Sequence, residues 1–342
     1  MKEVVARLSA LLLVLLAFGT FIPAAALRAQ STSAAETAQW NQALLDWRAE
    51  RAKDLTDPHG WLTLVGLEWL KPGVNSVGSA GDNQIKLHLA AGAGHVPENQ
   101  ASGNQGSAKN EEKIPVHLGL FTVAGKIVQV LAPAAGFPDG FLINGQPARE
   151  GILTVGGAHP SVLSWGTLSM VVIERDGRYA LRIRDSASPT LQNFHGLNWY
   201  APSLHFRVEA LWIPYTPPHI EKIPTVIGTT LELPVPGAAE FSLDGETMRI
   251  EPVVEEAEDG SGKKLMFILR DETSKTTTYQ ASRFLYTGMP DNGLGADGVL
   301  MLDFNRLENP PCAYTAYATC PLPPEQNKLP VALEAGEMRY VP

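Results

Sequence analysis

The sequence predicts a mainly β protein, with two antiparallel β-sandwich or barrel-like domains and one N-terminal helix. Segments in which apolar and polar residues alternate with period two recur along most of the chain. The 31 glycines and 26 prolines among 342 residues favour many turns over a helical bundle. The absence of a βαβ alternation argues against a doubly wound parallel sheet. We expect the first β domain at residues 57–175, and the second, with a C-terminal Cys/Pro motif, at residues 176–342.

Residues 1–26 are typical of a signal peptide. Lys2 and Arg7 precede an almost wholly apolar run from Leu8 to Ile22, and three alanines ending at Ala26 provide a cleavage site. The alternative is a membrane anchor, but the run is shorter than the ~20 residues that span a bilayer. We therefore expect a periplasmic or secreted protein with no transmembrane segment after cleavage.

An N-terminal helix is expected at residues 33–56. Ser33 and Glu36 have the spacing of a capping box, in which each residue bonds the backbone amide of the other. Trp40, Leu44 and Trp47 then fall on one face at helical spacing. The helix should end at the turn sequence Asp-Pro-His-Gly that begins at residue 57.

Strands are predicted through the rest of the chain. In the first domain they are expected within residues 61–70, 85–89, 114–132, 141–154 and 161–174. Residues 90–112 have no periodicity and predict a flexible loop. Asp-Gly pairs at 176–177 and 244–245 predict two-residue hairpin turns. The remaining strands are expected at 179–184, 206–212, 240–250, 265–270, 276–279 and 299–304.

Composition and motifs exclude several classes of function. The formal charge of −9 argues against a nucleic-acid partner. The chain lacks the G-x-S-x-G, P-loop, G-x-G-x-x-G and H-E-x-x-H motifs. Its eight histidines never recur at i, i+2 or i, i+4. We therefore predict no cofactor and no metal.

Candidate binding residues gather in polar groups within apolar surroundings. Arg184, Asp185 and His195 form one group, for which a structural salt bridge and turn is the alternative reading. Arg283, before an apolar run, has the same ambiguity. In the proline-rich C-terminal segment, short polar side chains either converge on a ligand or serve turns. The full set of candidates is Arg184, Asp185, His195, Arg283, Asp303, Asn305, Asn309, Tyr314, Asn327 and Glu337.

Several motifs carry a family resemblance. They are Gly60-Trp61-Leu62-Thr63-Leu64, Arg182-Ile183-Arg184-Asp185, Asn309-Pro310-Pro311-Cys312-Ala313-Tyr314 and Ala335-Gly336-Glu337. With them the chain resembles the bacterial and archaeal domain-of-unknown-function 1684 family over nearly all of the mature sequence. One departure is Leu307-Glu308, where the family usually has a small residue and an aromatic. The resemblance implies no activity, because the family has none assigned.

The first half is also similar, in the order of three short segments, to a forkhead-associated β-sandwich. The segments are 73–79, 83–87 and 143–146. The arginine that reads phosphothreonine in such domains falls at Ser79. The resemblance therefore implies a fold and not phosphopeptide binding.

Cys312 and Cys320 are the two cysteines of the chain. Three interpretations of the pair are open: a disulfide, a reactive thiol or a metal thiolate. A reactive thiol needs a base nearby, and a metal needs two further ligands that the spacing does not offer. In an exported protein we predict a disulfide, which would stabilise the short loop by about 2.5 kcal/mol on the chain-entropy model.

These features predict an exported protein that binds a small molecule, glycan or envelope component through its C-terminal half. One alternative is a hydrolase or transferase with Asp303 or Glu337 as general acid–base. Another is a structural protein of the cell envelope. Whether the protein is an enzyme is left open by the sequence.

Overall fold

The computed structural model of the chain describes residues 33–88, 114–157, 159–256 and 262–341. The predicted signal peptide at 1–26 and the predicted loop at 90–112 lie outside the described residues. The chain divides into two compact units, residues 1–42 and 43–342, and all of the sheets belong to the second.

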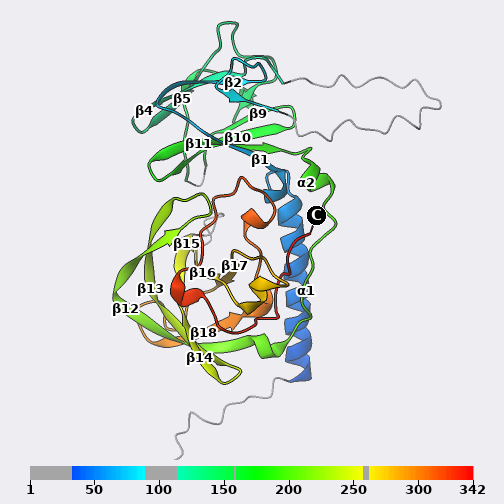
Figure 1. The fold of residues 1–342 in the computed structure, drawn as a ribbon, viewed down its shortest axis with the longest axis vertical. Helices are drawn as coiled ribbons and strands as arrows, with labels where there is room; N and C mark the ends of the chain where they lie inside the picture. Colours follow the sequence, from blue (N-terminus) through cyan, green and yellow to red (C-terminus); the bar gives the residue numbers. More distant parts are fainter. Residues whose placement is uncertain (1–32, 89–113, 158, 257–261, 342) are drawn as a thin grey trace, which may run out of the picture. The chain divides into compact units, whose positions relative to one another are not determined.

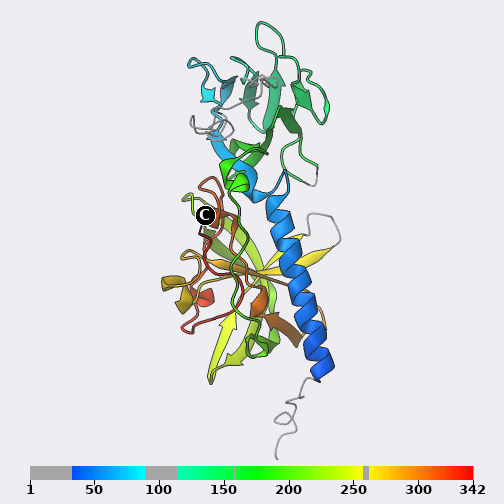
Figure 2. The same ribbon diagram turned by 90° about the vertical axis from the view of Figure 1, so that its right-hand side faces the viewer.

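The predicted N-terminal helix is present as α1 (Ala34–Thr56), which Figure 2 shows as one uninterrupted helix. The amide of Glu36 donates to Oγ of Ser33 at 3.2 Å, and the amide of Ser33 donates to Oε2 of Glu36 at 2.7 Å. These are the two reciprocal bonds of the predicted capping box. The same bonds lower the pKa of Glu36.

The strands up to residue 185 form two sheets, one of six and one of five strands (Figure 1). The first has the order β1 (Leu64–Trp69), β11 (Arg178–Asp185), β10 (Leu168–Arg175), β9 (Val162–Trp165), β6 (Leu142–Ile143) and β7 (Gln146–Pro147). The second has the order β3 (Ile85–Lys86), β2 (Gly73–Gly78), β4 (Gly119–Ala124), β5 (Ile127–Leu131) and β8 (Gly151–Ile152). The pairs are antiparallel except for β2 with β3. Val77, Phe121 and Leu163 are fully buried between them.

The hairpin of β10 and β11 turns at Asp176 and Gly177, whose φ angles are 54° and 69°. Two positive φ angles give a turn whose twist matches that of the strands, as the Asp-Gly pair predicts. Strand β11 also pairs with β1 along its other edge. This hairpin crosses the expected domain boundary between residues 175 and 176, and both of its strands belong to the first group of sheets.

The strands after residue 206 form two further sheets. One has the order β14 (Glu246–Ile250), β13 (Thr230–Leu243), β12 (Arg207–Pro224) and β18 (Gly298–Asp303). The other has the order β15 (Val253–Glu256), β16 (Lys263–Leu269) and β17 (Arg283–Thr287). Trp212, Phe267 and Phe304 are buried in a shared core. Antiparallel sheets with one N-terminal helix confirm the predicted mainly β class.

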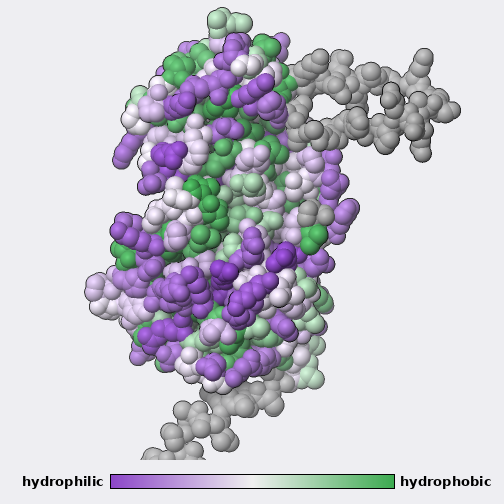
Figure 3. Space-filling model, in the orientation of Figure 1, coloured by the Kyte–Doolittle hydropathy of each residue, from purple (hydrophilic) through white to green (hydrophobic). Residues whose placement is uncertain are grey.

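Along β14, buried and exposed residues alternate, so one face of the sheet packs against the core. Met248 and Ile250 are buried, whereas Thr247 and Arg249 are exposed. Successive side chains of a strand point to opposite faces, so the buried pair lies on the core side. Hydrophilic residues predominate where β12, β13 and β14 reach the surface in Figure 3.

The predicted strand at 276–279 is wrong, because this segment is a turn. Asp271 caps a short 3₁₀ helix (Glu272–Lys275) by accepting from the amide of Thr273. The hydroxyl of Thr273 donates to Asp271 at 2.6 Å and lies 2.8 Å from the hydroxyl of Thr278. Side chains that bond nearby polar groups in this way compete with a strand ladder.

The C-terminal segment, residues 304–341, lies against β16 and β17 with little regular structure (Figure 1). Phe284 and Glu308 exchange two backbone hydrogen bonds of 2.8 and 2.9 Å. Arg270 and Lys328 form a second isolated bridge. The segment therefore extends the smaller sheet by single contacts, and these contacts fix where its side chains point.

Candidate functional site

Arg51, near the end of α1, is the centre of a buried ionic cluster. Its Nε donates to Oε1 of Glu337 at 3.0 Å, and its Nη2 donates to the carbonyl of Asn309 at 2.8 Å. Its Nη1 lies 3.4 Å from Oε1 of Glu308, and the arginine side chain is 12% exposed. Burial opposes the charge of Arg51, but Glu308 and Glu337 outweigh it and raise the pKa of the guanidinium.

Glu337 is fully buried behind Arg51. Its Oε2 accepts hydrogen bonds from the amide of Asn309 at 2.7 Å and from the hydroxyl of Tyr314 at 2.9 Å. Gly336 makes this position reachable, because it has a φ of +77° and a Cβ there would lie 2.5 Å from the carbonyl of Leu307. Charge-assisted bonds from several donors stabilise a buried carboxylate. Glu337 is therefore the anchor that orients Arg51.

Glu308 meets a different nitrogen of Arg51 from the one that Glu337 bonds. Its backbone is fixed by the two bonds to Phe284 of β17, and its side chain is 14% exposed. Burial raises the pKa of Glu308 to about 7, although the positive charge of Arg51 acts in the other direction. A carboxyl group with this pKa exchanges its proton near neutral pH.

Two cavities, of about 620 and 750 Å³, meet at this pair. We call them together the Glu308 cleft. Six residues line both: Arg51, Asp54, Trp61, Lys264, Tyr286 and Glu308. The first cavity adds acidic Glu50 and Asp57, and the second adds basic Arg175 and Arg182. The cleft thus offers charges of both signs to one ligand.

Aromatic rings and cations alternate on the wall of the cleft. The guanidinium carbons of Arg182 and Arg184 lie 5.2 and 5.8 Å from the ring centroid of Trp61. Nζ of Lys264 lies 4.1 Å from the ring of Tyr286. Such contacts hold cations in place by attraction to the ring face. They place cationic groups next to flat apolar surfaces, a combination that suits a small polar ligand.

Four of the sequence-predicted candidates lie at this site. Arg184 lines the cleft. Asn309, Tyr314 and Glu337 belong to the ionic cluster around Arg51. The structure thus brings together residues that lie far apart in the sequence, and it places Glu337 behind the cleft wall.

Asp303 and Asn305 serve a turn instead. Oδ1 of Asp303 accepts from the amide of Asn305 at 3.2 Å and from its Nδ2 at 2.9 Å. Asn305 also bonds both the amide and the carbonyl of Ser203. The bonds between Asp303 and Asn305 are turn contacts, and the charges of both Asp303 and Glu337 act on Arg48 of α1.

Three other candidates also lie apart from the cluster. Oδ1 of Asp185 accepts from the amide of Ala187, which is a turn contact. Asn327 bonds both the amide and the carbonyl of Glu251. His195 is exposed after the single-turn helix α2 (Pro189–Gln192). Asp185 thus satisfies a backbone group of its own turn, whereas Asn327 ties its segment to the residue after β14.

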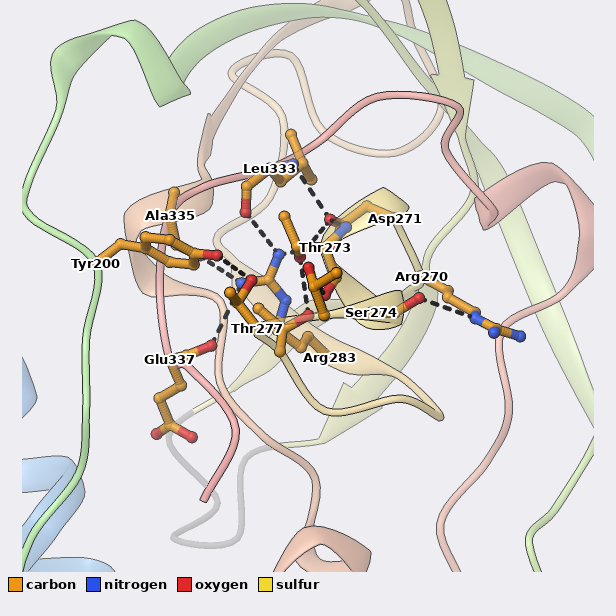
Figure 4. Close-up of polar contacts among 12 residues, drawn as sticks. Tyr200, Arg270, Asp271, Thr273, Ser274, Thr277, Arg283, Leu333, Ala335 and Glu337 are labelled. Atoms are coloured by element: carbon orange, nitrogen blue, oxygen red, sulfur yellow. Dashed lines mark hydrogen bonds and ion pairs between the residues drawn. The ribbon is translucent and has the colours of Figure 1, made fainter. Parts of the chain in front are cut away.

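Arg283 is a buried structural clamp (Figure 4). Its Nη2 donates to Oδ2 of Asp271 at 2.7 Å and to the carbonyl of Leu333 at 2.9 Å, and its Nη1 donates to the carbonyl of Ala335. In Figure 4 the carboxylate of Glu337 points away from Arg283. Arg283 therefore holds the C-terminal segment in place from within the core.

Sequence reasoning missed Glu308 and Arg51 as site residues. Arg51 has the pattern of any helical surface arginine, and only its distant partners reveal its burial. Glu308 stands directly before Asn309 in the proline-rich motif, so its position was the signal that could have found it. Trp61, which follows the turn at the end of α1, also lines the cleft.

Cys312 and Cys320 are free in the structure and adjacent. The amide of Cys312 donates to Sγ of Cys320 at 3.2 Å. Hydrogen bonding between the two sulfurs lowers the pKa of Cys312 and raises that of Cys320. Cys320 lines the larger cavity of the cleft.

Ligand atoms suited to a metal come together at His219, Glu221 and Glu251 among the described residues. This group is separate from the residues that line the Glu308 cleft. The described part of the chain contains no helix with both the length and the apolar character needed to cross a membrane.

Comparisons with known proteins find the predicted family over the second part of the chain. Residues 192–338 match the family described as a protein of unknown function (DUF1684). No curated protein matches the chain. Among solved structures, the chain is similar to the solution NMR structure of an uncharacterized protein of Haloarcula marismortui, with 29% sequence identity and a TM-score of 0.35. That similarity covers 43% of this chain and 78% of the other.

Proposed function

We propose that the protein is exported and binds a small polar molecule of the cell envelope, such as a glycan fragment, in the Glu308 cleft. The observation that carries this proposal is the Arg51–Glu308 pair in the wall shared by both cavities. The pair offers a fixed cation beside a carboxyl group that can donate or accept a proton near neutral pH. A purely structural role would require neither.

The chemistry of the cleft favours a ligand with hydroxyl groups or charges of both signs. Guanidinium groups donate in a planar fork, and carboxylates accept from hydroxyl or ammonium groups. Trp61 and Tyr286 supply flat apolar surfaces next to these groups. A few polar contacts around aromatic surfaces fix the orientation of a small molecule in a pocket.

Binding can be tested with a panel of neutral oligosaccharides, amino sugars and dipeptides, by isothermal titration calorimetry. Lys264→Ala should weaken the binding of a panel member at least tenfold, because Lys264 lines both cavities. The matched control is Lys263→Ala on the same strand, whose side chain is exposed. Equal affinity of wild type, Lys264→Ala and Trp61→Ala for every ligand that binds would overturn the proposal.

A second candidate function is hydrolysis or group transfer, with Glu308 as general acid–base. Its raised pKa favours this role, because efficient proton transfer needs a group that titrates near the working pH. The sequence suggested Asp303 or Glu337 as the general acid–base, and here Glu308 takes that role. Asp303 bonds Asn305 within a turn, and Glu337 bonds Asn309 in the cluster around Arg51. Mass spectrometry of the same panel after incubation should then show products with wild type and none with Glu308→Gln.

We also propose that the mature protein is periplasmic or secreted and that its two cysteines form a disulfide. The adjacency of Cys312 and Cys320 supports the second proposal, because a thiol oxidant of the export compartment can remove two electrons and two protons from neighbouring thiols. Cell fractionation and N-terminal sequencing test the first. The exported protein should begin at Leu27, and retention of Met1 would contradict the proposal.

A further inference from the structure

Three potential metal ligands lie together near the end of the large β12–β13 ribbon. His219 and Glu221 are two residues apart on β12, so their side chains leave the same face of the strand. Glu251 directly follows β14 and comes from a different segment of the chain. The ligand atoms of all three lie within 4.8 Å of one another.

The separations of these atoms are those of ligands around a common cation. Nε2 of His219 lies 3.5 Å from Oε2 of Glu221 and 3.4 Å from Oε2 of Glu251. Bonds of about 2.0–2.1 Å to a tetrahedral zinc ion place neighbouring ligand atoms about 3.3–3.4 Å apart. A direct charge-assisted hydrogen bond would be shorter, about 2.7–2.9 Å.

The same chain provides an internal comparison. His205 and Asp244 form an exposed pair in which Nε2 lies 3.0 Å from Oδ1. That imidazole meets its carboxylate at hydrogen-bond distance, whereas His219 stands farther from both of its carboxylates. His219 is thus placed between two carboxylates without closing on either.

Glu251 is held by neighbours in the way that metal ligands are held. The hydroxyl of Tyr215 donates to its Oε1 at 2.6 Å, and Nε2 of Gln326 donates to its Oε2 at 2.7 Å. Partners of this kind orient a ligating carboxylate and tune its affinity for the metal.

We propose that His219, Glu221 and Glu251 bind a zinc-class divalent cation. One nitrogen and two oxygens suit zinc, and hard cations such as magnesium seldom take imidazole. The exposed fractions of the side chains are 41%, 28% and 11%, so a solvent molecule can complete the coordination from one side. The site is independent of the Glu308 cleft and gives the protein a second binding function.

The test is the number of zinc equivalents bound by the purified full chain, measured by titration calorimetry with ZnCl₂. His219→Ala should bind one equivalent fewer than wild type. The difference in zinc equivalents between wild type and His219→Ala measures this site alone, because zinc bound elsewhere, including any at Cys312 and Cys320, is present in both proteins. Tyr215→Phe should keep the site and weaken it by about 10- to 100-fold, because it removes an orienting bond.

His205→Ala is the matched control and should bind as many equivalents as wild type. Glu221→Gln provides a second way to remove a ligand if His219→Ala fails to fold, which circular dichroism detects. An unchanged number of zinc equivalents in the folded variant that lacks His219 or the Glu221 carboxylate would overturn the proposal. Binding of MgCl₂ by wild type with the same affinity and stoichiometry as ZnCl₂ would also contradict the proposed preference for zinc.

Discussion

The guanidinium of Arg51 bonds the carboxylate of Glu337 at 3.0 Å, across 286 residues of sequence. This bond joins the end of α1 to the end of the chain and is completely shielded on the glutamate side. It also sets the direction in which Arg51 meets Glu308. The Glu308 cleft therefore depends on a contact that local sequence patterns cannot reveal.

Replacing Arg51 by Met should destabilise the protein by about 3–5 kcal/mol, because it leaves Glu337 as a buried charge without its cation. Urea unfolding at pH 7 measures the change. Lys53→Met is the control on the same helix, because its pair with Glu50 is 75% and 59% exposed. An exposed pair contributes up to about 1 kcal/mol. Similar losses in the two variants would contradict the buried cluster.

Glu308 should make stability depend on pH between 4.5 and 7. Its pKa rises from 4.5 to about 7 on folding, so the folded state holds the proton more tightly than the unfolded state. The resulting stabilisation is complete below pH 4.5 and is lost as the pH rises through 7. Glu308→Gln should remove this pH-dependent loss. At pH 8 its free energy of unfolding should exceed that of wild type by roughly 3 kcal/mol.

Urea unfolding of both proteins at pH 4.5 and pH 8 measures this difference. Glu325→Gln serves as the control, because the side chain of Glu325 is 86% exposed. A constant difference between wild type and Glu308→Gln at the two pH values would show that Glu308 keeps an ordinary pKa.

Arg283→Met should destabilise the protein by about 3–5 kcal/mol, since Asp271 would remain buried without a countercharge. The released carbonyls of Leu333 and Ala335 also lose their donor. Arg249→Met removes a pair that is 48% and 36% exposed and should change stability by less than about 1 kcal/mol. Thermal unfolding distinguishes the two, and a small effect at Arg283 would restore it as a binding candidate.

The cysteine pair predicts that protein isolated from the periplasm or medium carries no alkylation label. Unfolding in denaturant before alkylation exposes Cys320, so burial cannot hide a free thiol. Mass spectrometry should show zero labels without reductant and two labels after reduction. Two labels without reductant would leave the thiols free and exclude the disulfide.

Local signals predicted much of the fold. The capping box at Ser33 and the Asp176-Gly177 turn each act over a few residues, so their physics is readable from the sequence. The strand predicted at 276–279 was wrong because side-chain bonds override the strand preference of its residues. Its threonines suit a strand, but Asp271 and the hydroxyl of Thr273 bond within the turn.

The candidate site was harder to predict, because its contacts are long-range. Tyr314 and Glu337 were found because polar residues in a proline-rich segment already suggest a fixed path. Asn327 shares that signal, and Arg283 was chosen because it precedes an apolar run, yet both bond backbone groups inside the fold. Composition cannot distinguish a buried polar group that binds a ligand from one that completes the fold.

The bond between Arg51 and Glu337 also has a consequence for the order of assembly. The ribosome makes Arg51 long before Glu308 and Glu337, the carboxylates that neutralise it. A growing or truncated chain must therefore keep Arg51 in water, since burying it alone is too unfavourable. Completion of this region therefore waits until Glu308 and Glu337 have been synthesised.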